Sequence, residues 1–106
     1  MDVSYQKKEK SLVIKFTEEI DHHTTEKIRR IADYEIERYI PRKVIFDFNN
    51  VSFMDSAGIG LILGRYKNAL SLGIKVELIN VNKSIYKILQ MSGITRLLDV
   101  KKEECA

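Results

Sequence analysis

The sequence has little of what marks disulfide-rich or membrane-spanning proteins. Its single cysteine, Cys105, has no second cysteine to pair with, so an internal disulfide is excluded. No apolar run approaches the length of a membrane-spanning helix, since the longest candidate, Ile59 to Leu63, is interrupted by Gly60. Residues 1–10 are mostly polar or charged, which predicts that no signal peptide is present. We therefore expect a cytoplasmic protein.

Length and composition bound the size of the fold. A chain of 106 residues with 44% hydrophobic and 31% charged residues can bury one hydrophobic core without disulfides or a metal. We therefore expect a single domain over residues 1–106.

Charge is distributed unevenly along the chain, although the net value is only +3. Residues 17–37 carry seven acidic and three basic side chains, whereas residues 58–96 carry six basic and one acidic. The basic residues are widely spaced, with no arginine-rich helix and no run of basic and aromatic residues. We therefore expect no direct nucleic-acid partner and no direct membrane partner. A nucleic-acid adaptor is kept as an alternative, which steep salt dependence of binding would reveal.

Hydrophobic periodicity predicts that strands alternate with helices. An apolar–polar alternation at 12–16 is typical of a half-buried strand, and residues 3–5 are its expected antiparallel partner. A helix over 28–40, ended by Pro41, and a strand over 44–48 are expected next. The second expected helix ends at Gly73 and carries Ile59, Ile62, Leu63, Tyr66 and Leu70 on one face, and a strand over 75–79 follows it. The chain is expected to end with a helix over 85–89, capped by Asn82 or Ser84 and closed by Gly93, and with a short strand or turn over 97–100.

This alternation favours parallel strand pairing with right-handed crossovers, which is an α/β fold. Loops that leave parallel strands meet at the carboxyl edge of the sheet, where such folds place their sites. Asp21 is therefore expected to lie near Asp55 and Ser56. The three loops expected at this edge are 17–23, 49–56 and 80–84.

Residues 55–60, with the sequence Asp-Ser-Ala-Gly-Ile-Gly, form the most unusual stretch of the chain. Ser56 falls where a helix is expected to begin, so it can be interpreted as a simple helix N-cap. A helix N-terminus also stabilises an anion, so a phosphoryl group on Ser56 would find a suitable site there. Gly58 and Gly60 would keep side chains from crowding that group. The residues alone leave both interpretations open.

The glycines of this region also allow a dinucleotide-binding interpretation. Gly58, Gly60 and Gly64 give a glycine-rich pattern between a strand and a helix, but nine residues separate Phe48 from Gly58. The dinucleotide motif needs a much tighter turn after the strand, so the pattern is weak. More simply, Gly60 and Gly64 would let the helix lie close to the sheet. A small nucleotide-binding module is kept as an alternative function.

Asp21, His22 and His23 precede the first expected helix, and Asp21 is placed to act as its N-cap. Two adjacent histidines cannot both bind one metal from a helix start, and no suitable third ligand follows, so we expect no metal site. A catalytic serine needs a base and an orienting group, but no nucleophile elbow surrounds Ser56. A chain this short also leaves little room for a substrate pocket. We therefore expect neither an enzyme nor a cofactor.

Three stretches together resemble the STAS-domain family, and within it the anti-sigma-F factor antagonists of endospore-forming bacteria. Their order and spacing fit that family over nearly the whole chain. The stretches are residues 20–24 (Ile-Asp-His-His-Thr), residues 52–67 (Ser-Phe-Met-Asp-Ser-Ala-Gly-Ile-Gly-Leu-Ile-Leu-Gly-Arg-Tyr-Lys) and residues 91–94 (Met-Ser-Gly-Ile). The resemblance implies a STAS fold, with a small mixed sheet of about four to five strands and three to four packed helices.

The resemblance also implies a partner switch. The unphosphorylated protein would bind an anti-sigma-F factor that is also a serine kinase, and would thereby release sigma-F during sporulation. That kinase would phosphorylate Ser56, and a PP2C-type serine phosphatase would restore binding. Ala57 stands where the family often has a second serine or threonine, so Ser56 is the implied acceptor.

The residues that this resemblance implies in partner binding are Asp21, His22, His23, Asp55, Ser56, Ala57, Gly58, Ile59 and Gly60. An antagonist of a general-stress anti-sigma kinase is kept as an alternative, since only the partner would distinguish the two.

Overall fold

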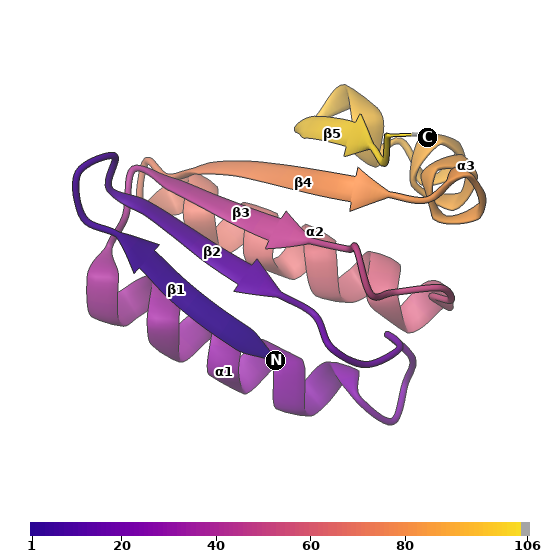
Figure 1. Cartoon of the computed structure of the whole chain (residues 1–106), viewed down its shortest axis with the longest axis horizontal. Coiled ribbons are helices and arrows are strands. Elements are labelled where there is room, and N and C mark those ends of the chain that lie inside the picture. The colour runs from indigo at the N-terminus through magenta and orange to yellow at the C-terminus, as the bar shows by residue number, and fades with distance from the viewer. Residues whose placement is uncertain (105–106) are drawn as a thin grey trace.

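A five-stranded mixed sheet organises the chain, and the computed structural model describes residues 1–104 (Figure 1). Cys105 lies outside the described residues. The elements are β1 (Asp2–Gln6), β2 (Ser11–Lys15), α1 (Thr25–Tyr39), β3 (Lys43–Asp47), α2 (Ser56–Ser71), β4 (Lys75–Val81), α3 (Lys83–Ser92), the 3₁₀-helix η1 (Ile94–Arg96) and β5 (Asp99–Lys102). This arrangement confirms the α/β fold class expected from the alternation of strands and helices.

The strands lie in the sheet in the order in which they occur in the chain. β1 is antiparallel to β2, and the pairings of β2 with β3, β3 with β4 and β4 with β5 are parallel, as predicted. β4 runs two residues beyond the predicted end, because Val81 pairs with Lys102 after a register shift. The last strand begins later than predicted, because η1 and the residues after it first turn the chain back toward the sheet.

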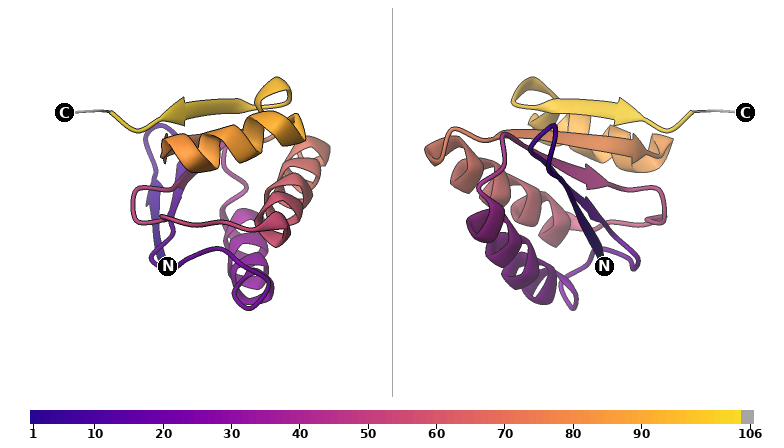
Figure 2. Two further views of the ribbon diagram at one scale, coloured as in Figure 1. Left: turned by 90° about the vertical axis from the view of Figure 1, so that its right-hand side faces the viewer. Right: turned by 60° about the vertical axis from the view of Figure 1, so that its left-hand side comes forward.

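One face of the sheet carries most of the core. Alternate residues of the central strands point to that face, and α1 and α2 cover it (Figure 2). Phe16, which follows β2, stacks on Phe46 of β3 with ring centroids 5.7 Å apart. Burial of this apolar surface is the main source of stability, at about 25 cal/mol per Å². The strand residues buried on this face are Leu12, Ile14, Val44, Phe46, Val76 and Leu78.

The helix ends follow local rules that the sequence already indicated. α1 stops before Ile40, which adopts a left-handed conformation (φ 41°) and is followed by Pro41. Asn82, one of the two candidate caps, begins α3 by accepting the N–H of Ile85 at 2.8 Å. Gly93 ends α3 at φ 87°, a conformation that favours glycine.

The buried face of α2 differs from the predicted one. Leu70 is 62% exposed, whereas Ala69 is fully buried. α2 packs against α1 as well as against the sheet, so its buried stripe is rotated relative to the apolar pattern. The buried α2 residues are Gly58, Leu61, Ile62, Arg65 and Ala69.

The rotation brings a charged residue into the interface between the two helices. The Nε atom of Arg65 on α2 lies 2.7 Å from Asp33 Oδ1 on α1, so the two side chains form a close ion pair. The N–H group is not aligned with the carboxylate oxygen as a hydrogen bond requires. Burial lowers the pKa of Arg65, and the Asp33 carboxylate offsets part of this effect. A buried guanidinium needs such a partner, because an unpaired buried charge is strongly destabilising.

Over residues 1–104, the structure contains no helix with the length and hydrophobicity needed to span a bilayer.

Candidate functional site

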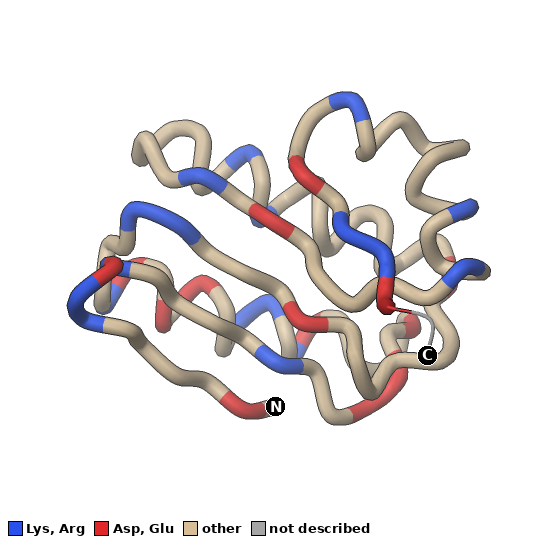
Figure 3. Tube along the Cα trace, turned by 45° about the horizontal axis from the view of Figure 1, so that its top comes forward, with Lys and Arg blue, Asp and Glu red and all other residues tan. Residues whose placement is uncertain are grey.

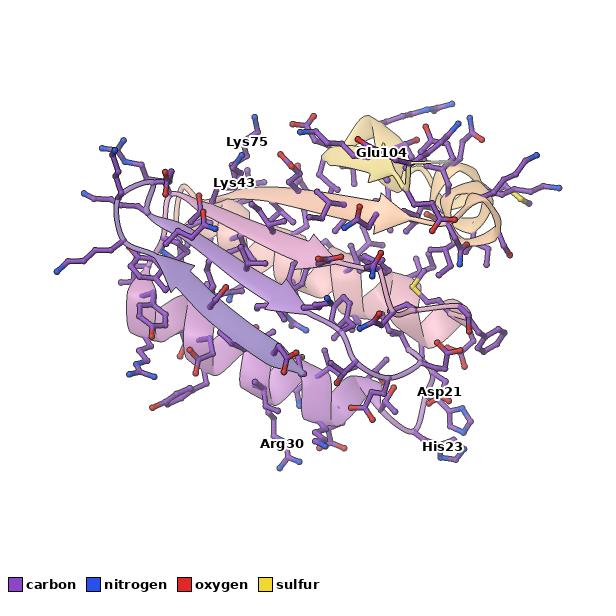
Figure 4. All side chains as sticks on the ribbon, viewed as in Figure 1. Asp21, His23, Arg30, Lys43, Lys75 and Glu104 are labelled. Carbon is purple, nitrogen blue, oxygen red and sulfur yellow. The ribbon has the colours of Figure 1, made fainter. Side chains whose placement is uncertain are left out.

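The loops after β2 and β3 come together at the carboxyl edge of the sheet. Ile20 forms a parallel bridge with Met54, in which the Ile20 N–H donates to Phe53 O (3.3 Å) and the Asp55 N–H donates to Ile20 O (3.1 Å). This pairing confirms that Asp21 and Asp55 lie on neighbouring loops. Figure 4 shows Asp21 and His23 at the end of the fold opposite Lys43 and Lys75, which begin their strands.

Asp55, and not Ser56, is the N-cap of α2. The Asp55 backbone is extended, and its Oδ1 atom accepts the N–H of Ala57 at 2.8 Å. A carboxylate caps a helix at least as well as a hydroxyl, and it also carries the charge that the helix N-terminus favours. The N-cap interpretation of Ser56 is therefore wrong. Ser56 is the exposed first residue of the helix, and among residues 1–104 its hydroxyl has no hydrogen-bond partner.

Asp21 orders the turn that leads into α1, although Thr24 stands at the formal N-cap position. The Asp21 Oδ1 atom accepts the N–H groups of His23 (2.9 Å) and Thr24 (3.1 Å). Partial desolvation acts to raise the pKa of Asp21, but these backbone hydrogen bonds outweigh it and lower the pKa below its ordinary value. The prediction that Asp21 is the N-cap of α1 is therefore wrong, because Asp21 caps the turn that precedes the helix.

We expect Asp21→Ala to lower the free energy of unfolding, because two backbone N–H groups lose their acceptor. Asp21→Asn keeps an acceptor oxygen at the same place and is the matched control. Urea denaturation of the three proteins measures the difference. Equal stability of the Ala and Asn variants would contradict the capping role.

His22 links the two loops. Its backbone N–H donates to Asp55 Oδ2 at 3.3 Å, and its ring Nδ1 lies 3.8 Å from the same oxygen. The ring of His23 lies 3.8 Å from that of His22, and both residues are exposed. In the described part of the chain, no group of three His, Cys, Asp or Glu side chains is arranged to hold a metal ion.

The start of α2 lies so close to Met54 and Ile20 that position 58 requires glycine. A Cβ atom at this position would clash with the side chain of Met54, with Sδ at 2.6 Å, and would lie 3.1 Å from Ile20 Cγ2. Gly60 and Gly64 have no atom within 4 Å of such a Cβ, so the prediction that they let the helix approach the sheet is wrong. All three glycines lie within α2 and not in the turn before it. They therefore do not form a phosphate-binding loop of the dinucleotide type.

A groove of about 250 Å³ opens beside Ala57, between α1 and α2. The groove is lined by Thr25, Glu26, Arg29, Ala57, Gly60, Leu61 and Arg65.

The basic residues are not gathered on one helix. Figure 3 shows them dispersed over loops, strands and helices, with acidic residues between them.

The family model described as the STAS domain matches residues 2–104. The chain belongs to the STAS-domain family. The anti-sigma F factor antagonist of Paenibacillus polymyxa is 33% identical over 93 residues, covering 88% of this chain and 80% of that relative.

Solved structures of the family agree with this membership. The anti-sigma factor antagonist SpoIIAA in its unphosphorylated form matches with a TM-score of 0.79 at 29% identity, over 96% of this chain and 88% of that one. The phosphorylated form of Bacillus SpoIIAA matches with a TM-score of 0.72 at 29% identity, over 96% of this chain and 91% of that one. The STAS fold implied by the sequence stretches is thereby confirmed.

Within this STAS chain, the structure brings most of the predicted site residues to one surface, while their role in binding stays a prediction. Ser56 and Gly60 are exposed, and Ala57 and Ile59 are half-buried. Gly58 is buried against the core and serves the packing of α2 instead.

The binding residues implied by the sequence do not include two residues of this surface. Phe53 is 55% exposed directly before the buried Met54, and Glu19 contacts the loop that carries Phe53. A single apolar residue in a loop gives no periodic signal, and a side-chain contact across 34 positions has no local signature.

Proposed function

We propose that this STAS chain is an anti-anti-sigma factor controlled by phosphorylation of Ser56. The unphosphorylated form binds an anti-sigma-F factor that is a serine kinase and so releases sigma-F during sporulation. Phosphorylation of Ser56 by that kinase ends the interaction, and a PP2C-type serine phosphatase restores it. The chain is a ligand and a substrate in this cycle, acts in the cytoplasm as one domain, and catalyses no step itself.

The observation that carries the proposal is the position of Ser56. Its side chain is exposed at the first residue of α2, between the capping carboxylate of Asp55 and the groove beside Ala57. A kinase can reach a hydroxyl in this position, because no internal hydrogen bond of the described residues holds it. The names of the relatives, one of which was solved in both phosphorylation states, support the same assignment.

The geometry also supports a local mechanism for the switch. A phosphoryl group adds a charge of roughly −1.5 to −2 at neutral pH. It would stand next to Asp55 and close to the loop of Asp21, so any partner group that approaches this surface meets three anionic groups instead of two. The start of α2 tolerates the phosphate, because a helix N-terminus favours an anion. No refolding of the domain is needed.

The direct test mixes the purified chain with a sporulation anti-sigma-F kinase and ATP. We expect one phosphate, located at Ser56 by mass mapping and absent from Ser56→Ala. Ser84→Ala, which removes an exposed serine from the first turn of α3, is the matched control and should be modified normally. A folded chain that this kinase does not modify would contradict the sporulation assignment. Modification by a general-stress anti-sigma kinase would then favour the alternative partner.

A further inference from the structure

Glu19 ties the loop after β2 to the loop after β3. Its Oε1 atom accepts the backbone N–H of Ser52 at 2.9 Å and that of Phe53 at 3.3 Å, and its Oε2 atom accepts the Ser52 hydroxyl. These three contacts are called the Glu19 clasp. No other acceptor for the two N–H groups is found among residues 1–104.

We propose that Glu19 is a positioning residue, whose clasp holds the β3–α2 loop in the conformation that binds the anti-sigma factor. This inference rests on the proposed function. It adds a residue outside the predicted binding set and states what that residue does.

The clasp acts on the part of the loop that is least fixed by packing. Val51 and Met54 anchor the loop at 3% and 1% exposure, whereas Ser52 and Phe53 between them are exposed. Asn82 contacts only the carbonyl oxygens of this segment, at 3.2 Å from Val51 O and 3.4 Å from Ser52 O. Without Glu19, the two N–H groups would turn to water, and residues 52 and 53 would be held only through their carbonyl oxygens, by Asn82 and by the Ile20 N–H.

The arrangement favours positioning over direct contact with the partner. A carboxylate oxygen accepts about two hydrogen bonds, so Oε1 is fully used by the loop and Oε2 is partly used. The hydrogen bond from the Ser52 side chain and the backbone N–H groups lower the pKa of Glu19 below its ordinary value. The carboxylate therefore stays ionised near neutral pH and keeps its acceptor character.

A loop held in one conformation binds more tightly, because a larger fraction of the molecules is in the conformation that binds the partner. If loss of the clasp leaves about one molecule in ten in the binding conformation, the apparent affinity falls about tenfold. Local loosening of an exposed loop should change the melting temperature little, because the buried anchors remain in place.

The test compares Glu19→Ala and Glu19→Gln with the unaltered chain. Glu19→Gln keeps an oxygen for the two N–H groups and an amide for the Ser52 hydroxyl, so it is the conservative variant. Glu18→Ala is the matched control, because the neighbouring Glu18 lies 4.0 Å from Lys27 on α1 and does not contact the loop. The measurements are amide hydrogen exchange at residues 52 and 53 in the free protein, and the Kd for the anti-sigma factor.

We expect Glu19→Ala to speed amide exchange at both positions and to raise the Kd about tenfold, with Glu19→Gln recovering most of both effects. Unchanged exchange in Glu19→Ala would overturn the clasp. Faster exchange with an unchanged Kd would overturn the positioning role. A raised Kd with unchanged exchange would assign Glu19 to direct contact with the partner and would also overturn it. An unaltered chain that does not bind overturns the proposed function and this role with it, while the exchange rates still report whether the clasp exists.

Discussion

A Ser56→Asp variant is expected to bind the anti-sigma factor at least about a hundredfold more weakly than the unaltered chain, which corresponds to about 3 kcal/mol of binding free energy. The added carboxylate would stand one residue after the Asp55 cap, on the exposed end of α2. A partner that buries this surface must then desolvate a further charge beside the carboxylate of Asp55. Calorimetric titration with the anti-sigma factor measures the effect.

Two variants separate charge at Ser56 from other effects of substitution. Ser56→Ala removes the hydroxyl without adding charge and should bind within about threefold of the unaltered chain, since the Ser56 hydroxyl has no partner in the described residues. Ser4→Asp places the same charge at an exposed position in the middle of β1, away from the carboxyl edge of the sheet, and should also keep its affinity. Equal binding by Ser56→Asp and Ser56→Ala would contradict the electrostatic mechanism.

The phosphorylated chain offers an independent check on the local nature of the switch. We expect backbone NMR shifts on phosphorylation to be confined to the loops after β2 and β3 and to the first turns of α2. A large change across the sheet would show that the domain rearranges, and the local block would then be wrong.

Substitution of two glycines in the same helix is expected to change stability in opposite directions. Gly58→Ala should destabilise the fold by about 1 to 3 kcal/mol, because its new methyl group meets the side chain of Met54, which is 1% exposed, and lies close to Ile20. Gly60→Ala should stabilise it by up to about 1 kcal/mol, because alanine is the better helix former. At Gly60 the new methyl group has no neighbour within 4 Å.

Chemical denaturation of the two variants measures this difference directly, since both carry the same change at positions two residues apart. The shared substitution largely cancels the effect of helix propensity, so the remaining difference reports the contacts of the new methyl group with Met54 and Ile20. Two variants of equal stability would show that Met54 can repack, and would contradict the close approach of α2 to the loop.

The order of elements and the meeting of the two loops were predictable from the sequence. Alternating apolar residues in β2 and the helical repeat of α1 reflect which face of each element is buried, and this pattern is local. Pro41 and Gly93 mark helix ends through their own backbone preferences. Parallel pairing then follows from the alternation of strands and helices, and it brings the loops of Asp21 and Asp55 to one edge.

The tertiary structure alone decided how that edge is built. Asp55 and Ser56 are both good N-caps, so only the position at which the chain leaves the Ile20–Met54 bridge determines that Asp55 takes this role. The packing of α2 against α1 likewise buries Arg65 and exposes Leu70, against the order of their hydrophobicity. Contacts between residues far apart in the chain also decide which glycine is indispensable and which carboxylate holds the β3–α2 loop. Such contacts leave no periodic pattern, because each is made once, by one pair of side chains.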